Sequence, residues 1–302
     1  MPRATNHISI CICTFRRPKL LKRLLNRIED QRTDGIFSIS IVVVDNDAQE
    51  SGYDAVNEAR QQSKLLINYY VEPERNISLA RNRSVESAQG DFIAFIDDDE
   101  FPEEDWLLNA YRTLQSSGAT GVLGPVKPHF DLPPPKWLIQ SRILERPTFS
   151  TGWTLTNARD TRTGNVLFCG SLFSDRGNRF DPIYGRTGGG DAVFFKQMME
   201  KGYVFVWCNE AVVNEAVPLE RQRKSYYIKR AFTRGMSEAL ESPVISLSTL
   251  RSAMIIPVYA LVLPFAWLLG QHHFMRFLIK ECDHFAKLLA YLGIRPVRER
   301  PY

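Results

Sequence analysis

The stretch FIAFIDDDEFP, residues 92–102, joins an apolar run to three consecutive aspartates. The apolar part predicts a buried strand, which places Asp97, Asp98 and Asp99 at its carboxyl end. Like charges this close repel one another, and a buried carboxylate needs a partner. A capped turn is one explanation. The other is a site for a hard divalent cation, Mg²⁺ or Mn²⁺, held by one or two carboxylates and shared with substrate phosphates.

The residues that follow the three aspartates have a simpler explanation. Pro102, Glu103, Glu104 and Asp105 precede the run WLLNAYRTL. Proline and acidic side chains are typical of the first turn of a helix. We therefore expect a helix over 103–117.

Strand and helix patterns alternate through the first hundred residues. Continuous apolar strands separated by helices are typical of a parallel sheet that is covered on both faces. In such a sheet the ligand lies at the carboxyl ends of the strands, where Thr14–Arg17, Asp45–Asp47 and Asp97–Asp99 all fall. The expected strands are 8–15, 38–46, 66–72 and 91–97, and the expected helices are 18–31, 53–63 and 78–89.

The pattern is less regular after the helix at 103–117. The prolines of DLPPPKW indicate a stiff, irregular segment, and long loops of this kind are often binding loops or lids. We expect strands over 120–128, 164–173 and 203–215, a helix over 187–202 and a long loop over 129–150. Residues 1–215 are therefore expected to form one α/β domain, and residues 216–302 a helical region.

The helical region is expected to begin with a basic helix over 221–235. Arg223, Arg230 and Arg234 recur there at helical spacing and form a stripe. Such a stripe suits a lipid-linked diphosphate or membrane head groups, and it also suits a simple solvated face.

Residues 253–270 follow without a single charge and are interrupted by Pro257 and Pro264. A kinked buried helix, a re-entrant or interfacial membrane segment and a full membrane span are all compatible with this length. We expect the re-entrant or interfacial segment, followed by an amphipathic helix over 278–293.

Composition excludes several broad classes of protein. The chain has 302 residues, of which 44% are hydrophobic and 24% charged, as in ordinary globular proteins. A net charge of +4, without a recognisable motif, does not indicate nucleic-acid binding. The five cysteines have no zinc spacing and favour a reducing, cytoplasmic compartment. The first residues carry no signal-peptide hydrophobic region, and no phosphate-binding G-x-x-x-x-G-K-[ST] loop is present.

Four segments together resemble family 2 of the GT-A inverting glycosyltransferases. Their order and spacing agree with that family over roughly residues 8–215. The segment after them, VNEAVPLERQRKSYYIKRAFTRG (213–235), is similar to bacterial succinoglycan-type exopolysaccharide glucosyltransferases. The four segments are ICTFRRPKLL (12–21), IVVVDND (41–47), NISLARNRSVESAQGDFIAFIDDDE (76–100) and TGGGDAVFF (187–195).

The resemblance implies a GT-A fold, a Rossmann-like nucleotide-diphospho-sugar transferase fold with a mixed, mainly parallel sheet and helices on both faces. It also implies a donor site, in which the residues after the second strand contact the nucleobase and the arginine of the LARN segment lies beside the diphosphate. For Asp45 and Asp47, ordinary turn chemistry is the alternative. The donor-site residues implied are Thr14, Phe15, Arg16, Asp45, Asp47, Arg81 and Asp98.

The resemblance further implies a metal site and a general base. Asp97 and Asp99 match the outer positions of the family's metal-binding motif, and Glu215 falls where relatives place a further residue near the metal. For Glu215 a surface acid is the alternative. Asp191 matches the base that takes a proton from the acceptor hydroxyl as it attacks the anomeric carbon, so the configuration inverts. For Asp191 the alternative is a helix N-cap, and both roles are compatible.

One position departs from the family pattern. The family usually carries glutamate before this aspartate, where it supports acceptor contacts or loop geometry, and this chain has Gly190. The base is retained, but its acidic neighbour is lost.

These expectations describe a Mg²⁺- or Mn²⁺-dependent hexosyltransferase at the cytoplasmic face of the inner membrane, peripheral or re-entrant. The donor would be a nucleoside-diphosphate sugar, expected to be a UDP-sugar, and the acceptor a lipid-linked saccharide of a surface polysaccharide. A nucleotidyltransferase is disfavoured because CTFRRPKLL lacks the glycine-rich loop of such enzymes. The alternative function is a non-catalytic donor-binding or scaffold module, which the replacement of the usual glutamate by Gly190 favours.

Overall fold

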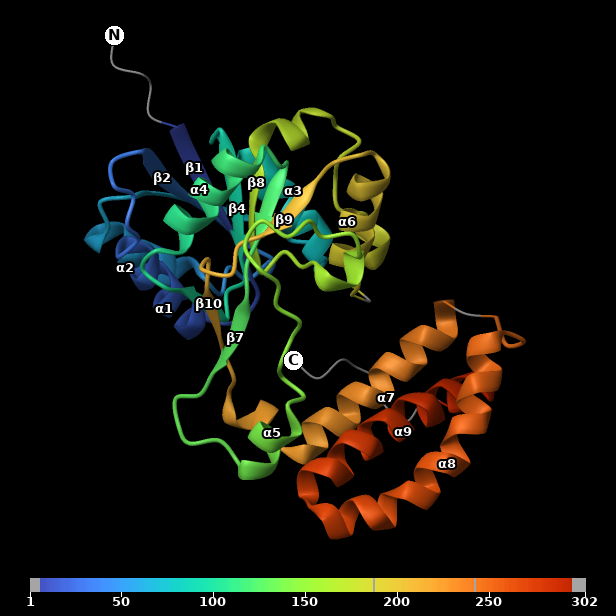
Figure 1. Ribbon diagram of the computed structural model, residues 1–302. Coiled ribbons are helices and arrows are strands. Elements are labelled where there is room, and N and C mark those ends of the chain that lie inside the picture. The colour runs from blue at the N-terminus through green and yellow to red at the C-terminus, as the bar shows by residue number, and fades with distance from the viewer. Residues whose placement is uncertain (1–5, 187, 242, 295–302) are drawn as a thin grey trace. The chain divides into compact units, whose positions relative to one another are not determined.

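The computed structural model describes residues 6–186, 188–241 and 243–294, which form two compact units (Figure 1). One unit comprises Met1–His129 and Arg146–Ala216, and the other comprises Phe130–Glu145 and Val217–Tyr302. Residues 130–145, which the sequence analysis placed in the first domain, therefore belong to the second unit.

The first unit is built on a seven-stranded sheet. Its strand order is β3-β2-β1-β4-β8-β6-β9. The strands β3, β2, β1 and β4 are parallel, and β8 runs antiparallel to both of its neighbours. The mixed, mainly parallel sheet expected from the sequence is therefore present. The strands are β1 (Asn6–Thr14), β2 (Phe37–Asp45), β3 (Leu66–Val71), β4 (Phe92–Ile96), β6 (Gly121–Leu123), β8 (Asn165–Cys169) and β9 (Phe205–Trp207).

Two separate apolar clusters cover the two faces of this sheet. Successive side chains of a strand point to opposite faces, so Ile10 of β1 joins one cluster and Cys11 the other. The first cluster includes residues of α1, α2 and α4, and the second includes residues of α3 and α6. The helices are α1 (Pro18–Glu29), α2 (Tyr53–Gln62), α3 (Ile77–Ser87), α4 (Trp106–Ser117) and α6 (Gly190–Glu200), with short 3-10 turns η1 (Ala158–Asp160), η2 (Gly170–Ser174) and η3 (Pro182–Tyr184).

A second, three-stranded sheet has the order β5-β10-β7. Its strands are β5 (Glu100–Pro102), β7 (Val126–His129) and β10 (Val213–Ala216). The expected strand over 120–128 is in fact two strands, β6 and β7, separated at Gly124 and Pro125 and paired in different sheets. The expected strand over 203–215 divides in the same way into β9 and β10. Pro102 ends β5 and does not open the following helix, which begins at Trp106.

The second unit is helical. It contains α5 (Lys136–Ser141), η4 (Leu219–Gln222), α7 (Lys224–Glu241), α8 (Leu247–Leu269) and α9 (Gln271–Tyr291). The segment expected as a long loop thus contains a short helix, α5, whose Trp137 packs edge-on against Tyr227 of α7. In the basic stripe, Arg223 and Arg230 are exposed, whereas Arg234 is paired with Asp283 of α9.

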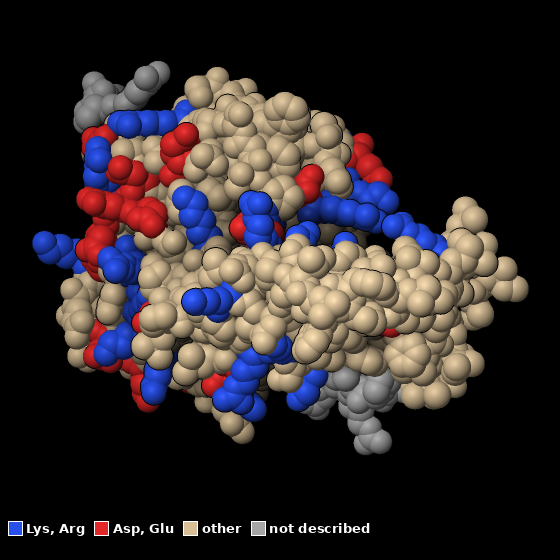
Figure 2. Space-filling view, turned by 60° about the horizontal axis from the view of Figure 1, so that its bottom comes forward, with Lys and Arg blue, Asp and Glu red and all other residues tan. Residues whose placement is uncertain are grey.

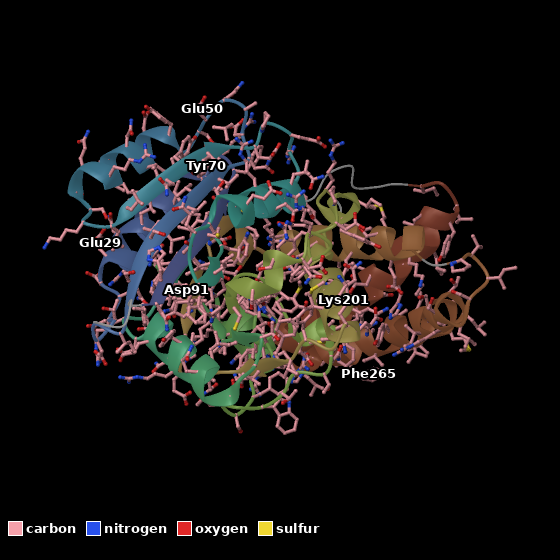
Figure 3. The ribbon with its side chains drawn as sticks, turned by 90° about the horizontal axis from the view of Figure 1, so that it is seen from above. Glu29, Glu50, Tyr70, Asp91, Lys201 and Phe265 are labelled. Carbon is pink, nitrogen blue, oxygen red and sulfur yellow. The ribbon has the colours of Figure 1, made fainter. Side chains whose placement is uncertain are left out.

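The helix α8 presents its apolar side chains to solvent. Only Ser252 and Ala266 of its 23 residues are buried, and Phe265, labelled in Figure 3, is 68% exposed. Figure 2 shows a broad surface of uncharged atoms over this unit. By length and composition α8 is long and apolar enough to cross a membrane. The alternative of a buried, proline-kinked helix does not match this exposure.

Candidate functional site

The expected site residues meet at the carboxyl edge of the parallel strands. The hydroxyl of Thr14, the last residue of β1, donates to Asp98 Oδ2 at 2.8 Å. Asp98 follows β4, and β1 and β4 are adjacent in the sheet. The structure therefore brings these two parts of the expected donor site into direct contact.

The turn after β2 is held by Asp45. Its carboxylate accepts hydrogen bonds from the main-chain N–H groups of Asp47 and Gly52 and from the Tyr69 hydroxyl, at 3.0, 2.6 and 2.9 Å. Asp45 is completely buried. The Asp45 carboxylate therefore holds the turn together, which agrees with the alternative of ordinary turn chemistry. Its contact with a nucleobase stays a prediction.

Asp47 faces the first-strand loop. Arg16 Nε donates to Asp47 Oδ2 at 2.9 Å, and this interaction holds the pKa of Asp47 below its usual value. Two guanidinium groups lie near the ring of Phe15, with Arg16 at 5.0 Å and Arg75 at 4.8 Å from its centre. An aromatic face flanked by cations suits a planar base with phosphates attached.

Arg17 lies in the loop Thr14–Arg17 that was expected at the site, but its pairing with the aspartates was not predicted. Its Nη1 donates to Asp98 Oδ1 at 2.9 Å and to Asp99 Oδ2 at 3.0 Å. It neutralises part of the acidic cluster from the loop that also carries Thr14. The sequence signal was available, since Arg17 is the second arginine of the quoted FRRPKLL segment.

Asp191 is held between an arginine and a threonine. Arg81 Nη1 donates to Asp191 Oδ1 at 2.7 Å, and Thr163 donates to Asp191 Oδ2 from its hydroxyl at 3.1 Å and from its N–H at 3.3 Å. Burial would raise the pKa of Asp191, but the charge of Arg81 and the Thr163 hydrogen bonds outweigh it and leave the pKa below the usual value. Asp191 is therefore ionised at neutral pH. It lies in the first turn of α6, and no side-chain cap closes that helix.

The glycine run before Asp191 sets its position. Gly188 and Gly189 have φ of 87° and 85°, a backbone region that favours glycine. Gly190 begins α6 and lies 3.4 Å, measured to an added Cβ, from the buried Ser78 hydroxyl, which has no hydrogen-bond partner among the described residues. Thr187, the first residue of the quoted motif, lies outside the described residues.

Two glutamates face each other beside the aspartates. Glu100 of β5 and Glu215 of β10 are paired directly across an antiparallel ladder, where like charges are unfavourable. Arg146 Nη2 relieves this repulsion by donating to Glu215 Oε2 at 2.6 Å. Gly164 packs against the same group, since a Cβ there would lie 2.6 Å from Glu100 Oε1. Direct metal binding by Glu215 stays a prediction.

The acidic cluster carries raised pKa values. Burial, and then the neighbouring Asp99, raise the pKa of Asp97 to about 7, although 48% of its side chain is exposed and water therefore moderates the effect. Burial raises the pKa of Asp98 to about 6, against the opposing charge of Arg17. Burial, with Asp97 and Asp99 nearby, raises the pKa of Glu100 well above its usual value. A cation bound beside these carboxylates would lower all three pKa values.

The donor set fits Mg²⁺ or Mn²⁺ in chemistry. Within the described ranges, no three His, Cys, Asp or Glu side chains form a ready-made metal group. The groups present are carboxylates, and Mg²⁺ commonly uses only one or two of these, with substrate phosphates and water completing its shell. Asp97 is accessible for this, since 48% of its side chain is exposed, and Asp99 lies two residues further along the same turn.

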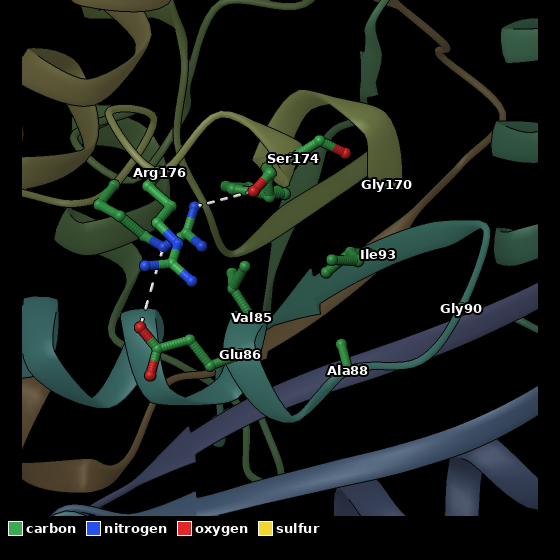
Figure 4. Close-up of a pocket in the computed structure, with 10 residues that line it drawn as sticks. Val85, Glu86, Ala88, Gly90, Ile93, Gly170, Ser174 and Arg176 are labelled. Atoms are coloured by element: carbon green, nitrogen blue, oxygen red, sulfur yellow. Dashed lines mark hydrogen bonds and ion pairs between the residues drawn. The ribbon is translucent and has the colours of Figure 1, made fainter.

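A separate hollow of 660 Å³ lies away from these residues (Figure 4). Val85, Glu86 and Ala88 form one side, and Ser174 and Arg176 lie opposite. Because Gly90 and Ile93 also line it, the hollow is at the amino end of β4, whereas Asp97–Asp99 follow its carboxyl end. None of the expected site residues lines it. The hollow is therefore separate from the expected donor and metal residues.

Sequence comparison matches the chain to a family model and to several curated proteins. Residues 9–177 match the model of a family described as glycosyl transferase family 2. The chain is also 35% identical over 237 residues to the succinoglycan biosynthesis protein ExoM of Rhizobium meliloti, which covers 78% of this chain and 75% of that protein.

Comparison with solved structures gives the fold. The mannosyltransferase PcManGT from Pyrobaculum calidifontis, solved with GDP-Man and Mn²⁺, has a TM-score of 0.58 and 19% identity, covering 97% of this chain and 75% of that one. S. aureus TarS 1-349, solved with UDP-GlcNAc, has a TM-score of 0.54 and 16% identity, covering 95% and 92%. The GT-A fold expected from the sequence is confirmed.

Proposed function

The chain belongs to glycosyl transferase family 2, and we propose that it is an inverting enzyme that transfers a hexose from a nucleoside-diphosphate sugar to a lipid-linked saccharide. A UDP-sugar is the expected donor, and the product would be a surface exopolysaccharide. The similarity to ExoM, a succinoglycan biosynthesis protein, supports the pathway, and the UDP-GlcNAc and GDP-Man bound in proteins of the same fold support the class of donor.

The observation that carries this proposal is the position of Asp191. An ionised carboxylate, steadied by Arg81 and Thr163, stands at the carboxyl edge with the aspartates that follow β4. Arg81 Nη2 is 3.9 Å from Asp97 Oδ1, so one guanidinium links the two groups. Asp191 would accept the proton of the acceptor hydroxyl while that oxygen attacks the anomeric carbon.

The donor would be held by the first-strand loop and the aspartates. Phe15 and Arg16 would contact the nucleotide, and Arg81 would contact the diphosphate. Asp97 and Asp99 would hold Mg²⁺ or Mn²⁺, which when bound neutralises charge on the leaving diphosphate. The raised pKa values of this cluster support a need for positive charge there.

The lipid-linked acceptor is supported by the second unit. The exposed apolar side chains of α8 would lie at the cytoplasmic face of a membrane, peripheral or re-entrant. Such a location would keep the enzyme where a lipid-linked acceptor is found.

The alternative is a non-catalytic donor-binding or scaffold module. The observation that favours it is Gly190, which leaves Asp191 without an acidic neighbour and Ser78 without a hydrogen-bond partner among the described residues. Such a module would bind donor and release nothing from it.

Release of nucleoside diphosphate tests the proposal. The purified full-length chain is incubated with UDP-Glc, UDP-Gal, UDP-GlcNAc, UDP-GlcA or GDP-Man, with membrane lipid extract, and with or without Mn²⁺ or Mg²⁺. We expect release from one preferred donor that needs metal and is lost in Asp99→Asn and Asp191→Asn. Donor binding without release, even with defined lipid-linked acceptors, would favour the scaffold.

A further inference from the structure

Arg162 is a charged residue of the site to which the proposed function assigns no role. It stands directly before Thr163, which holds Asp191, and Gly164, which packs on Glu100. This segment is anchored by Asn165, whose amide donates to the Pro125 and Ala211 carbonyls at 3.1 and 2.7 Å. Asn165 also accepts from the Trp106 indole at 2.7 Å. Arg162 is therefore presented from a fixed point beside the base.

Three other guanidinium groups near the aspartates have carboxylate partners. Arg17 pairs with Asp98 and Asp99, and Arg81 pairs with Asp191. Arg146 pairs with Glu215 at 2.6 Å.

Arg162 differs from these three arginines. It is half-buried, and within the described part of the chain it donates no hydrogen bond and makes no ion pair. Burial and the charge of Arg146 lower its pKa to about 10, against the attraction of Glu100, Glu215 and Asp191. A cation that loses water without gaining a partner is costly, and such groups concentrate at functional sites.

We propose that Arg162 binds an oxyanion carried by the acceptor, and that it thereby selects acceptors that bear a negative charge. The inference rests on the proposed function, since it assigns the acceptor side to Asp191 and its neighbours. The donor diphosphate is already provided with Arg81 and the aspartates after β4. The uncharged Gly190 leaves no acidic side chain before Asp191 to repel such an anion.

The oxyanion on the acceptor has two possible sources. One is the diphosphate that links the saccharide to lipid, and the other is a carboxylate on an acceptor sugar. Three synthetic acceptors separate them: a neutral undecyl disaccharide, the same disaccharide on undecyl diphosphate, and a neutral-linked disaccharide that ends in a uronic acid. Binding of each to the full chain is measured by calorimetry with UDP and Mn²⁺, and turnover by release of nucleoside diphosphate.

Arg162→Gln is the main variant, with Arg162→Lys to retain the charge. Arg159→Gln is the matched control, because Arg159 is an exposed arginine three residues earlier. We expect wild type to bind a charged acceptor more tightly than the neutral one. Arg162→Gln should remove that preference with a loss of roughly 10- to 100-fold, as for a hydrogen-bonded ion pair, while Arg162→Lys retains part of it. The charged acceptor whose binding is weakened by Arg162→Gln identifies the source of the oxyanion.

A structural role for Arg162 predicts a different result. If the guanidinium supports the fold, Arg162→Gln lowers the melting temperature and weakens all three acceptors together. If Arg162 binds the acceptor, the melting temperature of Arg162→Gln is unchanged or higher, because a half-buried cation without a direct partner among the described residues has been removed. The KM of the donor is then also unchanged. The inference is overturned by a raised donor KM alone, or by equal binding of charged and neutral acceptors to wild type. Tight binding of a charged acceptor without release from any donor would instead contradict the proposed function.

Discussion

Arg81 Nη1 lies 2.7 Å from Asp191 Oδ1, so the expected ligand of the donor diphosphate is ion-paired with the expected base. The side chain of Arg81 is only 8% exposed, and Asp191 is 31% exposed. Asp191 is therefore ionised but already engaged by Arg81. A diphosphate beside Arg81 would compete for the same guanidinium and leave Asp191 more available to an acceptor hydroxyl.

Asp191→Asn is expected to lower kcat by about 10²- to 10⁴-fold, the usual contribution of a general base. The donor KM should change little, because the amide keeps the shape of the side chain. The measurement is steady-state release of nucleoside diphosphate, with the exposed Asp175→Asn as control. A variant that keeps full activity would remove Asp191 from the mechanism.

Arg81→Gln is expected to raise the pKa of Asp191. The charge of Arg81 is the largest influence that lowers this pKa, and burial, which raises it, would remain. The measurement is a pH titration of ¹³C-labelled aspartate carboxyl shifts, with the Asp191 signal assigned by its absence from Asp191→Asn. An unchanged pKa would contradict the ion pair.

The same pair gives a pH dependence of stability with a definite sign. The pKa of Asp191 is lower in the folded chain than its ordinary value of 3.8. Its contribution to the free energy of unfolding is thus present above pH 3.8 and lost as the pH falls through the lower, folded value. Urea unfolding of wild type and Asp191→Asn should differ most at neutral pH, by about 1–3 kcal/mol, and converge in acid. A difference that grows in acid would show the opposite linkage.

Gly190→Ser is expected to raise the free energy of unfolding by roughly 0.5–1 kcal/mol. Gly190 lies within α6 at an ordinary φ, and a serine hydroxyl there would reach the unpartnered Ser78 hydroxyl. Gly189→Ser is the control and should destabilise the chain, because Gly189 has a φ of 85°. Chemical denaturation compares them, and equal effects of both changes would contradict the structural difference between the two positions.

Mn²⁺ alone is expected to bind weakly, and UDP should tighten it at least about tenfold. Asp98 and Asp99 are engaged by Arg17, and phosphate oxygens are needed to complete the coordination shell. Electron paramagnetic resonance of free Mn²⁺ measures both affinities. Tight binding without UDP would mean that the protein alone supplies the full ligand set.

Replacing Phe265 and Leu268 together by serine is expected to reduce binding to anionic vesicles. Both side chains of α8 are largely exposed, and their burial in lipid would be lost. Leu66→Ser is the control, since Leu66 is 63% exposed on β3 of the other unit. Vesicle flotation gives the answer, and equal flotation of all three proteins would argue against α8 as the membrane contact.

The fold of the first hundred residues was predictable because local patterns there agree with tertiary structure. The expected strands and helices differ from the observed ones by at most a few residues, and Thr14 and Asp98 meet as the parallel sheet requires. Prediction failed where pairing is non-local. The Gly124–Pro125 pair does mark a break in the run 120–128, but no local signal there or in the run 203–215 indicates that the two halves will pair in different sheets.

The site was predicted unevenly for the same reason. The carboxylates are recognisable because they recur at the ends of predicted strands, whereas the side chains that pair with them, cationic or neutral, come from distant positions in the chain. Arg146 reaches Glu215 across 69 positions of sequence, and Thr163 is 28 residues from Asp191. No local motif marks either residue, and only the folded chain identifies them.

Because β8 runs in the reverse direction, the residues of the site come from two separate stretches of the sequence. The parallel strands β1, β2 and β4 deliver residues from their carboxyl ends, whereas β8 runs antiparallel to β4 and reaches the same edge with its first residue, so Arg162–Gly164 arrive there from the chain before the strand. Thr14 to Asp99 and residues 146–191 are thus separate stretches of gene. A chimaera that exchanges only the second stretch with a relative should change what is glycosylated while the choice of sugar nucleotide is kept.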